Sequence, residues 1–142
     1  MKKAIILLLL ACNYSFAQTI IYENKLSWLG DDQRVADYID NEMPDDITIY
    51  VINGPVYRQH FAFVEVLPKK TYIITFSNNL TILECLNSYV HEMVHINQFY
   101  SGRARRKGVS MVWEGKTYGP FTRYSKRPWE NEAEAIARKF IR

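Results

Sequence analysis

Cysteine is scarce: the 142 residues of this chain include only Cys12 and Cys85. Cys12 lies in an apolar N-terminal segment that we expect to be cleaved off, which leaves one cysteine and rules out an intrachain disulfide. Cys85 falls on the apolar side of a predicted helix, where a free thiol serves as a small buried hydrophobic group. The sequence therefore argues against a disulfide-stabilised scaffold and against a catalytic thiol.

A strong excess of either charge is also missing. The 18 Lys and Arg residues against 15 Asp and Glu residues give a formal charge of +3, and the loss of residues 1–17 with their two lysines lowers it to +1. So balanced a chain indicates no nucleic-acid partner. The run of Arg103, Arg105, Arg106 and Lys107 is typical of a solvated loop, the alternative being contact with an anionic surface.

No apolar stretch is long enough to span a bilayer. The longest, residues 4–11, follows two lysines and precedes Ser15-Phe16-Ala17, whose small residues stand at the −3 and −1 positions of a signal-peptidase site. Residues 1–17 are therefore predicted to be a signal peptide for secretion or export to the periplasm. The segment ending at Cys12 resembles a lipoprotein cleavage site, but release after Ala17 is favoured because that junction is better formed.

Residues His91-Glu92-Met93-Val94-His95 have the HExxH spacing. Two imidazoles four residues apart on a helix point the same way, so both can reach one Zn²⁺ ion. The glutamate after the first histidine is then placed to deprotonate a zinc-bound water. A chance match in so short a chain is on the order of a few in a thousand. The pattern predicts a zinc site with His91 and His95 as ligands and Glu92 as general base.

The motif lies in a predicted helix with clear ends. Thr81 and Glu84 form a T-x-x-E capping box, and Gly102 supplies a C-terminal stop. Apolar side chains spread over more than half of the circumference, so the helix should be central in its domain. Its narrow polar strip would then face a cleft. The strip consists of Glu84, Asn87, Ser88, His91, His95 and Gln98.

A third zinc ligand is needed, and elimination narrows the choice. The extended pattern HExxHxxGxxH fails because Gln98 and Ser101 replace its glycine and its last histidine. The only other histidine, His60, lies upstream, and no aspartate follows His95. The downstream carboxylates are Glu114, Glu130, Glu132 and Glu134.

The predicted elements rank these four glutamates. Glu114 sits in the turn of a predicted hairpin and should be exposed. The other three open the last helix, where Glu130 falls about 60° from the centre of the apolar stripe and Glu132 and Glu134 about 100° away. Glu130 is therefore the preferred third ligand. Glu132 and Glu134 remain alternatives, and acidic residues at this position also complement the helix macrodipole, an interpretation that suits Glu132.

An HExxH helix followed some tens of residues later by a glutamate-bearing helix resembles the gluzincins in their minimal single-domain form. The resemblance covers most of the mature chain. It implies that His91, His95 and Glu130 hold zinc, and that Glu92 is the general base. In that family the acidic residue four positions beyond the third ligand often buttresses a zinc-bound histidine. Glu134 stands there, where gluzincins commonly have aspartate.

Stabilisation of a tetrahedral oxyanion needs a further hydrogen-bond donor. Tyr118 and Tyr124 lie between the two motifs, and His60 lies upstream. Each of these residues is more often structural, since the chain holds ten tyrosines. We take Tyr124 as the second catalytic candidate beside Glu92.

The remaining patterns predict one α+β domain that spans residues 18–142. No repeat, low-complexity tract, glycine-rich nucleotide loop or second domain is found. We expect a small, mostly antiparallel sheet packed on a central HExxH helix, with N-terminal and C-terminal helices, which is the zincin-like arrangement. The predicted elements are a helix from Asp31 or Asp32 to about Glu42, strands at 47–52, 61–67 and 71–76, a hairpin at 110–118, and a helix after Arg127.

Two functions remain open for this sequence. The first is a secreted zinc metallopeptidase that hydrolyses peptide bonds in a peptide or protein substrate. The second is a non-catalytic zinc-binding or envelope interaction protein on the same scaffold. A monomer is expected in either case.

Overall fold

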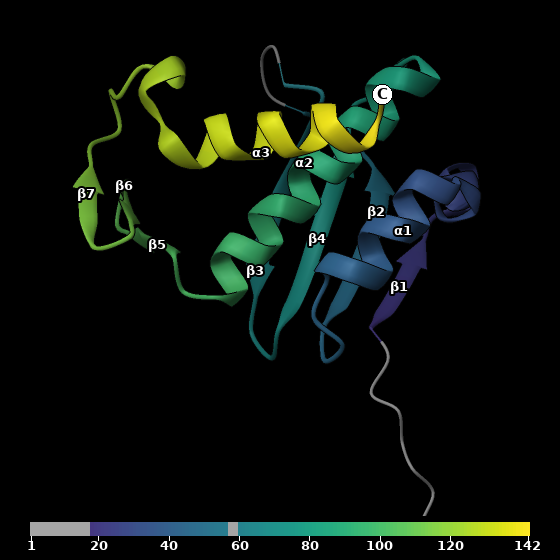
Figure 1. The fold of residues 1–142 in the computed structure, drawn as a ribbon, viewed down its shortest axis with the longest axis horizontal. Coiled ribbons are helices and arrows are strands. Elements are labelled where there is room, and N and C mark those ends of the chain that lie inside the picture. Colours follow the sequence, from purple (N-terminus) through teal and green to yellow (C-terminus); the bar gives the residue numbers. More distant parts are fainter. Residues whose placement is uncertain (1–17, 57–59) are drawn as a thin grey trace, which may run out of the picture.

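The computed structural model describes residues 18–56 and 60–142. The predicted signal peptide, residues 1–17, lies outside these ranges, and so does Cys12. The described chain is a mixed α+β domain with two small sheets, three α-helices and two short 3-10 helices. None of the helices in the described part is both long and apolar enough to cross a bilayer. The α-helices form a layer on the larger sheet, and the smaller sheet stands at one end (Figure 1).

Four strands form the larger sheet: β1 (Thr19–Tyr22), β2 (Thr48–Asn53), β3 (Ala62–Leu67) and β4 (Thr71–Phe76). Their order is β1-β2-β4-β3. The β1/β2 and β2/β4 pairs are parallel, and only β3/β4 is antiparallel. The prediction of a mostly antiparallel sheet is therefore wrong for the sheet that carries the HExxH helix.

The parallel pairings follow from the connections between strands. The chain leaves β1 through η1 (Asn24–Asp31) and α1 (Gln33–Glu42) and begins β2 at the end where β1 began, which is the crossover that parallel strands need. After β2 the chain enters the sheet again at its far edge as β3. The hairpin from β3 then brings β4 back between β3 and β2, parallel to β2. Strand β1 was not predicted, because it is only four residues long and directly follows the predicted signal peptide.

One face of the larger sheet is covered by the helices. In β2, Ile49 and Val51 are buried while Tyr50 and Ile52 are exposed, which is the alternation of a strand with one covered face. The central helix α2 (Ile82–Tyr100) packs on β3 and β4 and also on α3 (Pro128–Phe140). The core between these elements includes Ile49, Val51, Ile74, Phe76, Leu86, Tyr89, Val90 and Met93.

The ends of α2 are those that the sequence predicted. The Thr81 hydroxyl accepts a hydrogen bond from the Glu84 amide at 3.3 Å, and the Glu84 carboxylate accepts one from the Thr81 amide at 2.8 Å. This capping box satisfies two backbone donors that the helix itself leaves free. At the other end α2 stops at Tyr100, and Gly102 takes the left-handed φ of 74° that favours glycine.

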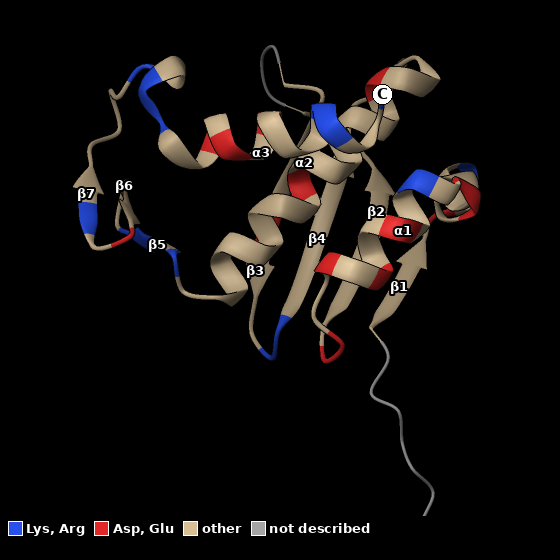
Figure 2. Cartoon of the chain, in the orientation of Figure 1, with Lys and Arg blue, Asp and Glu red and all other residues tan. Residues whose placement is uncertain are grey.

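The second sheet is antiparallel and consists of β5 (Ala104–Lys107), β6 (Ser110–Trp113) and β7 (Lys116–Tyr118). The sequence predicted the β6–β7 hairpin but not β5. Trp113 and Tyr118 pack against Trp129 in the first turn of α3, with ring centroids 6.5 and 5.3 Å away. A short 3-10 helix, η2 (Tyr124–Lys126), leads from this sheet into α3. Figure 2 shows several Lys and Arg residues on the sheet and in the loop that follows it.

The capping box can be tested by removing its hydroxyl. We expect Thr81→Ala to lower the free energy of unfolding by about 1 kcal/mol, measured by urea denaturation followed by circular dichroism. Thr81→Ser keeps the hydroxyl and should unfold within about 0.5 kcal/mol of the wild type. An equal loss in both variants would show that the hydroxyl does not cap α2.

Candidate metal centre

Two helices bring three ligand side chains to one point. His91 and His95 lie one turn apart on α2, and Glu130 comes from the first turn of α3. The Oε2 atom of Glu130 is 3.2 Å from His91 Nε2 and 3.1 Å from His95 Nε2. The two Nε2 atoms are 3.0 Å apart. This group can hold a metal ion, because its ligand atoms all lie within 4.8 Å of one another.

The spacing of these atoms fits a tetrahedral cation. Ligand atoms about 2.0–2.1 Å from a tetrahedral Zn²⁺ ion lie about 3.3 Å from one another, which is close to the three observed separations. The atoms are also of one chemical kind, since a carboxylate oxygen and the bare nitrogen of a neutral imidazole both present lone pairs. Lone pairs that face one another repel unless a proton or a cation lies between them. A cation at the centre replaces that repulsion with three attractive contacts.

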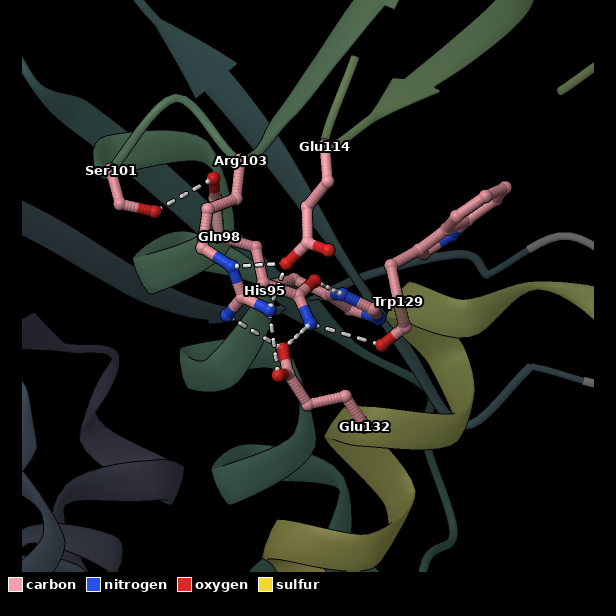
Figure 3. Close-up of polar contacts among 7 residues, drawn as sticks. All are labelled: His95, Gln98, Ser101, Arg103, Glu114, Trp129 and Glu132. Atoms are coloured by element: carbon pink, nitrogen blue, oxygen red, sulfur yellow. Dashed lines mark hydrogen bonds and ion pairs between the residues drawn. The ribbon is translucent and has the colours of Figure 1, made fainter. Parts of the chain in front are cut away.

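Gln98 determines which nitrogen of His95 faces this centre. The side chain of Gln98 is 2% exposed, and its Oε1 atom lies 2.8 Å from His95 Nδ1. Its Nε2 group donates to the Trp129 carbonyl at 3.0 Å and to Glu132 Oε2 at 2.8 Å, which fixes the orientation of the amide (Figure 3). Because the amide oxygen can only accept, His95 must donate its Nδ1–H. In neutral His95 the lone pair is then on Nε2, where a metal needs it.

Glu132 is held in turn by Arg103. The Arg103 guanidinium donates to the two Glu132 oxygens at 2.9 and 3.1 Å and to Glu114 Oε1 at 2.6 and 2.9 Å (Figure 3). It also lies 4.6 Å from the ring centroid of Trp113. These contacts join the end of α2, the turn of the second sheet and α3 beside the candidate metal centre. Glu132, which the sequence left as an alternative ligand, therefore has a different role, and Glu114 is exposed in the β6–β7 turn as predicted.

Burial and charge control the protonation of the candidate ligands. Burial raises the pKa of Glu130, but hydrogen bonds to His91 and His95 outweigh it, and the pKa lies well below its ordinary value. The carboxylate is therefore ionised at neutral pH, as a metal ligand must be. Burial lowers the pKa of His95, and the neighbouring carboxylates of Glu130 and Glu92 raise it by more, so the net shift is upward. Negative charge thus accumulates here and favours a bound cation.

A cleft opens over the three ligands. Two cavities of about 970 and 230 Å³ share His91 and Glu92 in their walls. The larger cavity is bordered by polar side chains of α2, Asn87 and Ser88, so the polar strip of this helix faces a cleft as predicted. The smaller cavity reaches His95 and Glu130. Its apolar wall includes Phe63, Phe99, Met111 and Trp129.

Glu92 lies beside the ligand group without taking part in it. Its side chain is 7% exposed and lines both cavities. Burial raises the pKa of this carboxyl, an effect that the two neighbouring histidines reduce. Glu92 is therefore a carboxylate at the floor of the cleft with access to the space over the three ligand atoms.

The three predicted oxyanion donors lie in different places. Tyr124 and His60 line both cavities, whereas Tyr118 packs edge-on against Trp129. Burial and the nearby charge of Glu130 raise the pKa of Tyr124, so its phenol keeps its proton and can donate it in a hydrogen bond. The structure thus places two of the three candidates at the cleft.

The residue that supports a histidine from outside is not the one that the gluzincin resemblance implied. Glu134 forms an ion pair with Arg138, and both line the larger cavity. Gln98 takes the supporting position instead, through its contact with His95. Sequence reasoning missed this role. The only sign of it was the place of Gln98 on the polar strip, one turn beyond His95.

Comparison with known proteins identifies no relative: no protein-family model, curated protein or solved structure matches this chain. The gluzincin resemblance therefore rests on the motif residues themselves. The chemistry of the site is inferred from its geometry.

Metal binding provides the direct test of this centre. We expect one Zn²⁺ ion per chain to bind the metal-free protein and to stabilise it by about 4 kcal/mol at a free concentration a thousandfold above Kd. Glu130→Gln removes a charged ligand and should weaken binding at least about a hundredfold. Glu134→Gln, one turn along the same helix, is the matched control and should bind as the wild type does. Calorimetry and melting with and without a chelator measure both, and an equal loss in the control would refute the ligand assignment.

The hydrogen bond between Gln98 and His95 can be tested separately. Gln98→Leu removes the acceptor for the His95 Nδ1–H, so we expect about 10- to 100-fold weaker metal binding. In the metal-free protein, at a pH above the raised pKa of His95, ¹⁵N NMR should show His95 as the Nδ1–H tautomer in the wild type and as a tautomer mixture in this variant. A general loss of stability would not change the tautomer.

A paired exchange separates charge from geometry in the same network. Gln98→Glu alone puts a carboxylate against Glu132 and should weaken metal binding. Adding Glu132→Gln restores a donor opposite the new carboxylate and should recover much of the affinity. Failure of the second change to rescue the first would show that the contact between these positions does not matter.

Proposed function

We propose that the protein is a zinc-dependent metallopeptidase of the gluzincin type, exported through the predicted signal peptide and acting on polypeptides. One observation carries this proposal: His91, His95 and Glu130 converge at the floor of an open cleft, with the Glu92 carboxylate beside them. A purely structural metal site is usually closed by a fourth protein ligand, whereas three ligands under a cleft leave a position open.

His91, His95 and Glu130 would hold the cation. Two imidazoles and one carboxylate form a donor set that Zn²⁺ takes in catalytic sites. A zinc ion bound there polarises a carbonyl group and lowers the pKa of water. The separations of the ligand atoms and the Nδ1–H tautomer imposed on His95 both support this fit.

Glu92 acts as the proton carrier in this proposal. It follows His91 in α2 and lines both cavities, so its carboxylate reaches the space above the ligand group from one side. There it takes a proton from the attacking water and delivers it to the leaving amine. Because Glu92 is not part of the ligand group, this role is separable from metal binding by mutation.

Tyr124 is the candidate donor to the oxyanion. It stands at the junction of the two cavities and is 44% exposed, so a substrate can reach its phenol. Its raised pKa keeps the O–H group protonated at neutral pH. A donor aimed at the developing negative charge lowers the barrier to hydrolysis.

The edge of the larger sheet supports a polypeptide substrate. Among the residues that the structure describes, strand β3 pairs only with β4, and its residues Ala62, Phe63 and Val64 line the smaller cavity. Its outer edge presents backbone N–H and C=O groups that no other strand of the sheet pairs. An extended peptide can pair with such an edge and so place a backbone carbonyl near the ligand group.

The general base can be removed without removing a ligand. We expect Glu92→Gln to bind zinc as the wild type does and to lower turnover of a fluorogenic peptide mixture by about 10²- to 10⁴-fold. Glu42→Gln on α1 is an isosteric control away from the cleft and should keep full activity. A chelator should abolish wild-type turnover, and zinc should restore it. Full turnover in zinc-loaded Glu92→Gln would refute the assigned base, and an inert zinc-loaded wild type would favour a non-catalytic protein.

A further inference from the structure

Positive charge is concentrated in one part of the chain. Residues 103–127 hold eight Lys and Arg against one Glu, a net charge of +7, whereas residues 18–102 hold five against eleven acidic residues, a net charge of −6. In Figure 2 blue marks β5, β7 and the loop before α3, and red is frequent around α1. The nearly neutral total therefore conceals two regions of opposite charge.

Most cations of this segment lack a counter-charge. Its single acidic residue, Glu114, pairs with Arg103. Like charges held close together repel, so such a cluster does not stabilise the fold. An external anionic surface would offset that repulsion. Within residues 18–56 and 60–142, the exposed cations of the segment that form no ion pair include Arg105, Arg106, Lys107, Arg123 and Lys126.

The same segment carries two prominent apolar side chains. Val109 is 82% exposed and Phe121 is 96% exposed, the highest values among the large apolar residues in the described part of the chain. Val109 lies in the β5–β6 turn, which follows the last strand pair, Lys107 with Ser110. Strand β7 runs antiparallel to β6 and so ends at the same end of the sheet, where the chain continues to Phe121. Both apolar side chains thus lie beyond one end of the second sheet.

The opposite end of the second sheet is fixed to the rest of the domain. There Arg103 joins Glu114 and Glu132, and Trp113 packs against Trp129. The β5–β6 turn is tight, because Gly108 takes a left-handed φ of 58°. The exposed side chains of Val109 and Phe121 therefore lie at the free end of a sheet that is anchored to α3.

We propose that this end of the second sheet docks on a bilayer surface that contains anionic phospholipids. The unpaired cations would contact the phosphate groups, and Val109 and Phe121 would enter the interfacial layer between headgroups and acyl chains. An acidic protein partner would pair with the cations, but it would not bury the two isolated apolar side chains of Val109 and Phe121. The combination of both features favours the lipid surface.

Docking would also hold the cleft close to the bilayer. The loop that bears Phe121 continues directly into Tyr124, which lines both cavities. Proteins and peptides at the membrane surface would then be the accessible substrates. The docking itself does not depend on peptidase activity, so vesicle binding tests it independently.

Sedimentation with vesicles tests the proposal on the mature chain. We expect binding to phosphatidylcholine vesicles that contain about 30% phosphatidylglycerol, no binding to phosphatidylcholine alone, and release at about 1 M salt. Removing three cations by Arg105→Gln, Lys107→Gln and Arg123→Gln should weaken binding about a hundredfold, at about fivefold per cation. Val109→Ser with Phe121→Ser should weaken it at least about tenfold.

Matched variants control for total charge and total apolar surface. Lys25→Gln, Lys69→Gln and Arg142→Gln also remove three cations, and Ile82→Ser with Leu83→Ser removes two exposed apolar side chains from the start of α2. Both control proteins should bind as the wild type does, and melting curves should show that all variants are folded.

Three results would overturn the docking proposal. One is a wild-type protein that does not bind the anionic vesicles, and another is an equal loss of binding in the control variants. The third is binding that polyglutamate competes away while the Val109/Phe121 variant still binds vesicles normally, which would indicate a general site for acidic polymers.

Discussion

The site depends on the packing of α3 against α2, which brings a carboxylate from one helix into contact with two imidazoles of the other. His91, His95 and Glu130 face one another across about 3 Å, and a proton or a metal cation must lie between their lone pairs to offset the repulsion. The fold must therefore hold both helices firmly. It does so with a capped α2 buried in the main core, and with the aromatic cluster around Trp129, the residue directly before Glu130 in the chain.

The polar network on the far side of His95 extends this constraint into the second sheet. Gln98 is almost fully buried, and both the oxygen and the nitrogen of its side-chain amide have partners, so its burial leaves no polar atom unsatisfied. Those partners connect through Glu132 and Arg103 to the β6–β7 turn. The second sheet is thus a structural part of the candidate centre, although none of its residues belongs to the ligand group.

The parts of this structure that local rules govern were readable from the sequence. Spacing on one helix placed His91 beside His95, and the wheel of the last helix pointed Glu130 inward, where the structure has it. The role of Gln98 was not readable, because its partners Trp129 and Glu132 lie more than thirty residues away and no local pattern connects them. The prediction of the strand directions in the larger sheet was wrong for a related reason. Alternation shows which face of a strand is covered, but the crossover connections decide its neighbours, and those connections are tertiary features.

The free edge of β3 has a further consequence for the protein in solution. Unpaired strand edges also pair with one another, so an edge that is open to substrate exposes the molecule to self-assembly into a continuous intermolecular ladder. Near the middle of that edge strand stands Glu65, an exposed carboxylate between Val64 and Val66. Two copies of β3 meeting centre to centre would bring their Glu65 charges together. Electrostatic repulsion of this kind leaves the unpaired strand edge available to a peptide substrate and discourages aggregation.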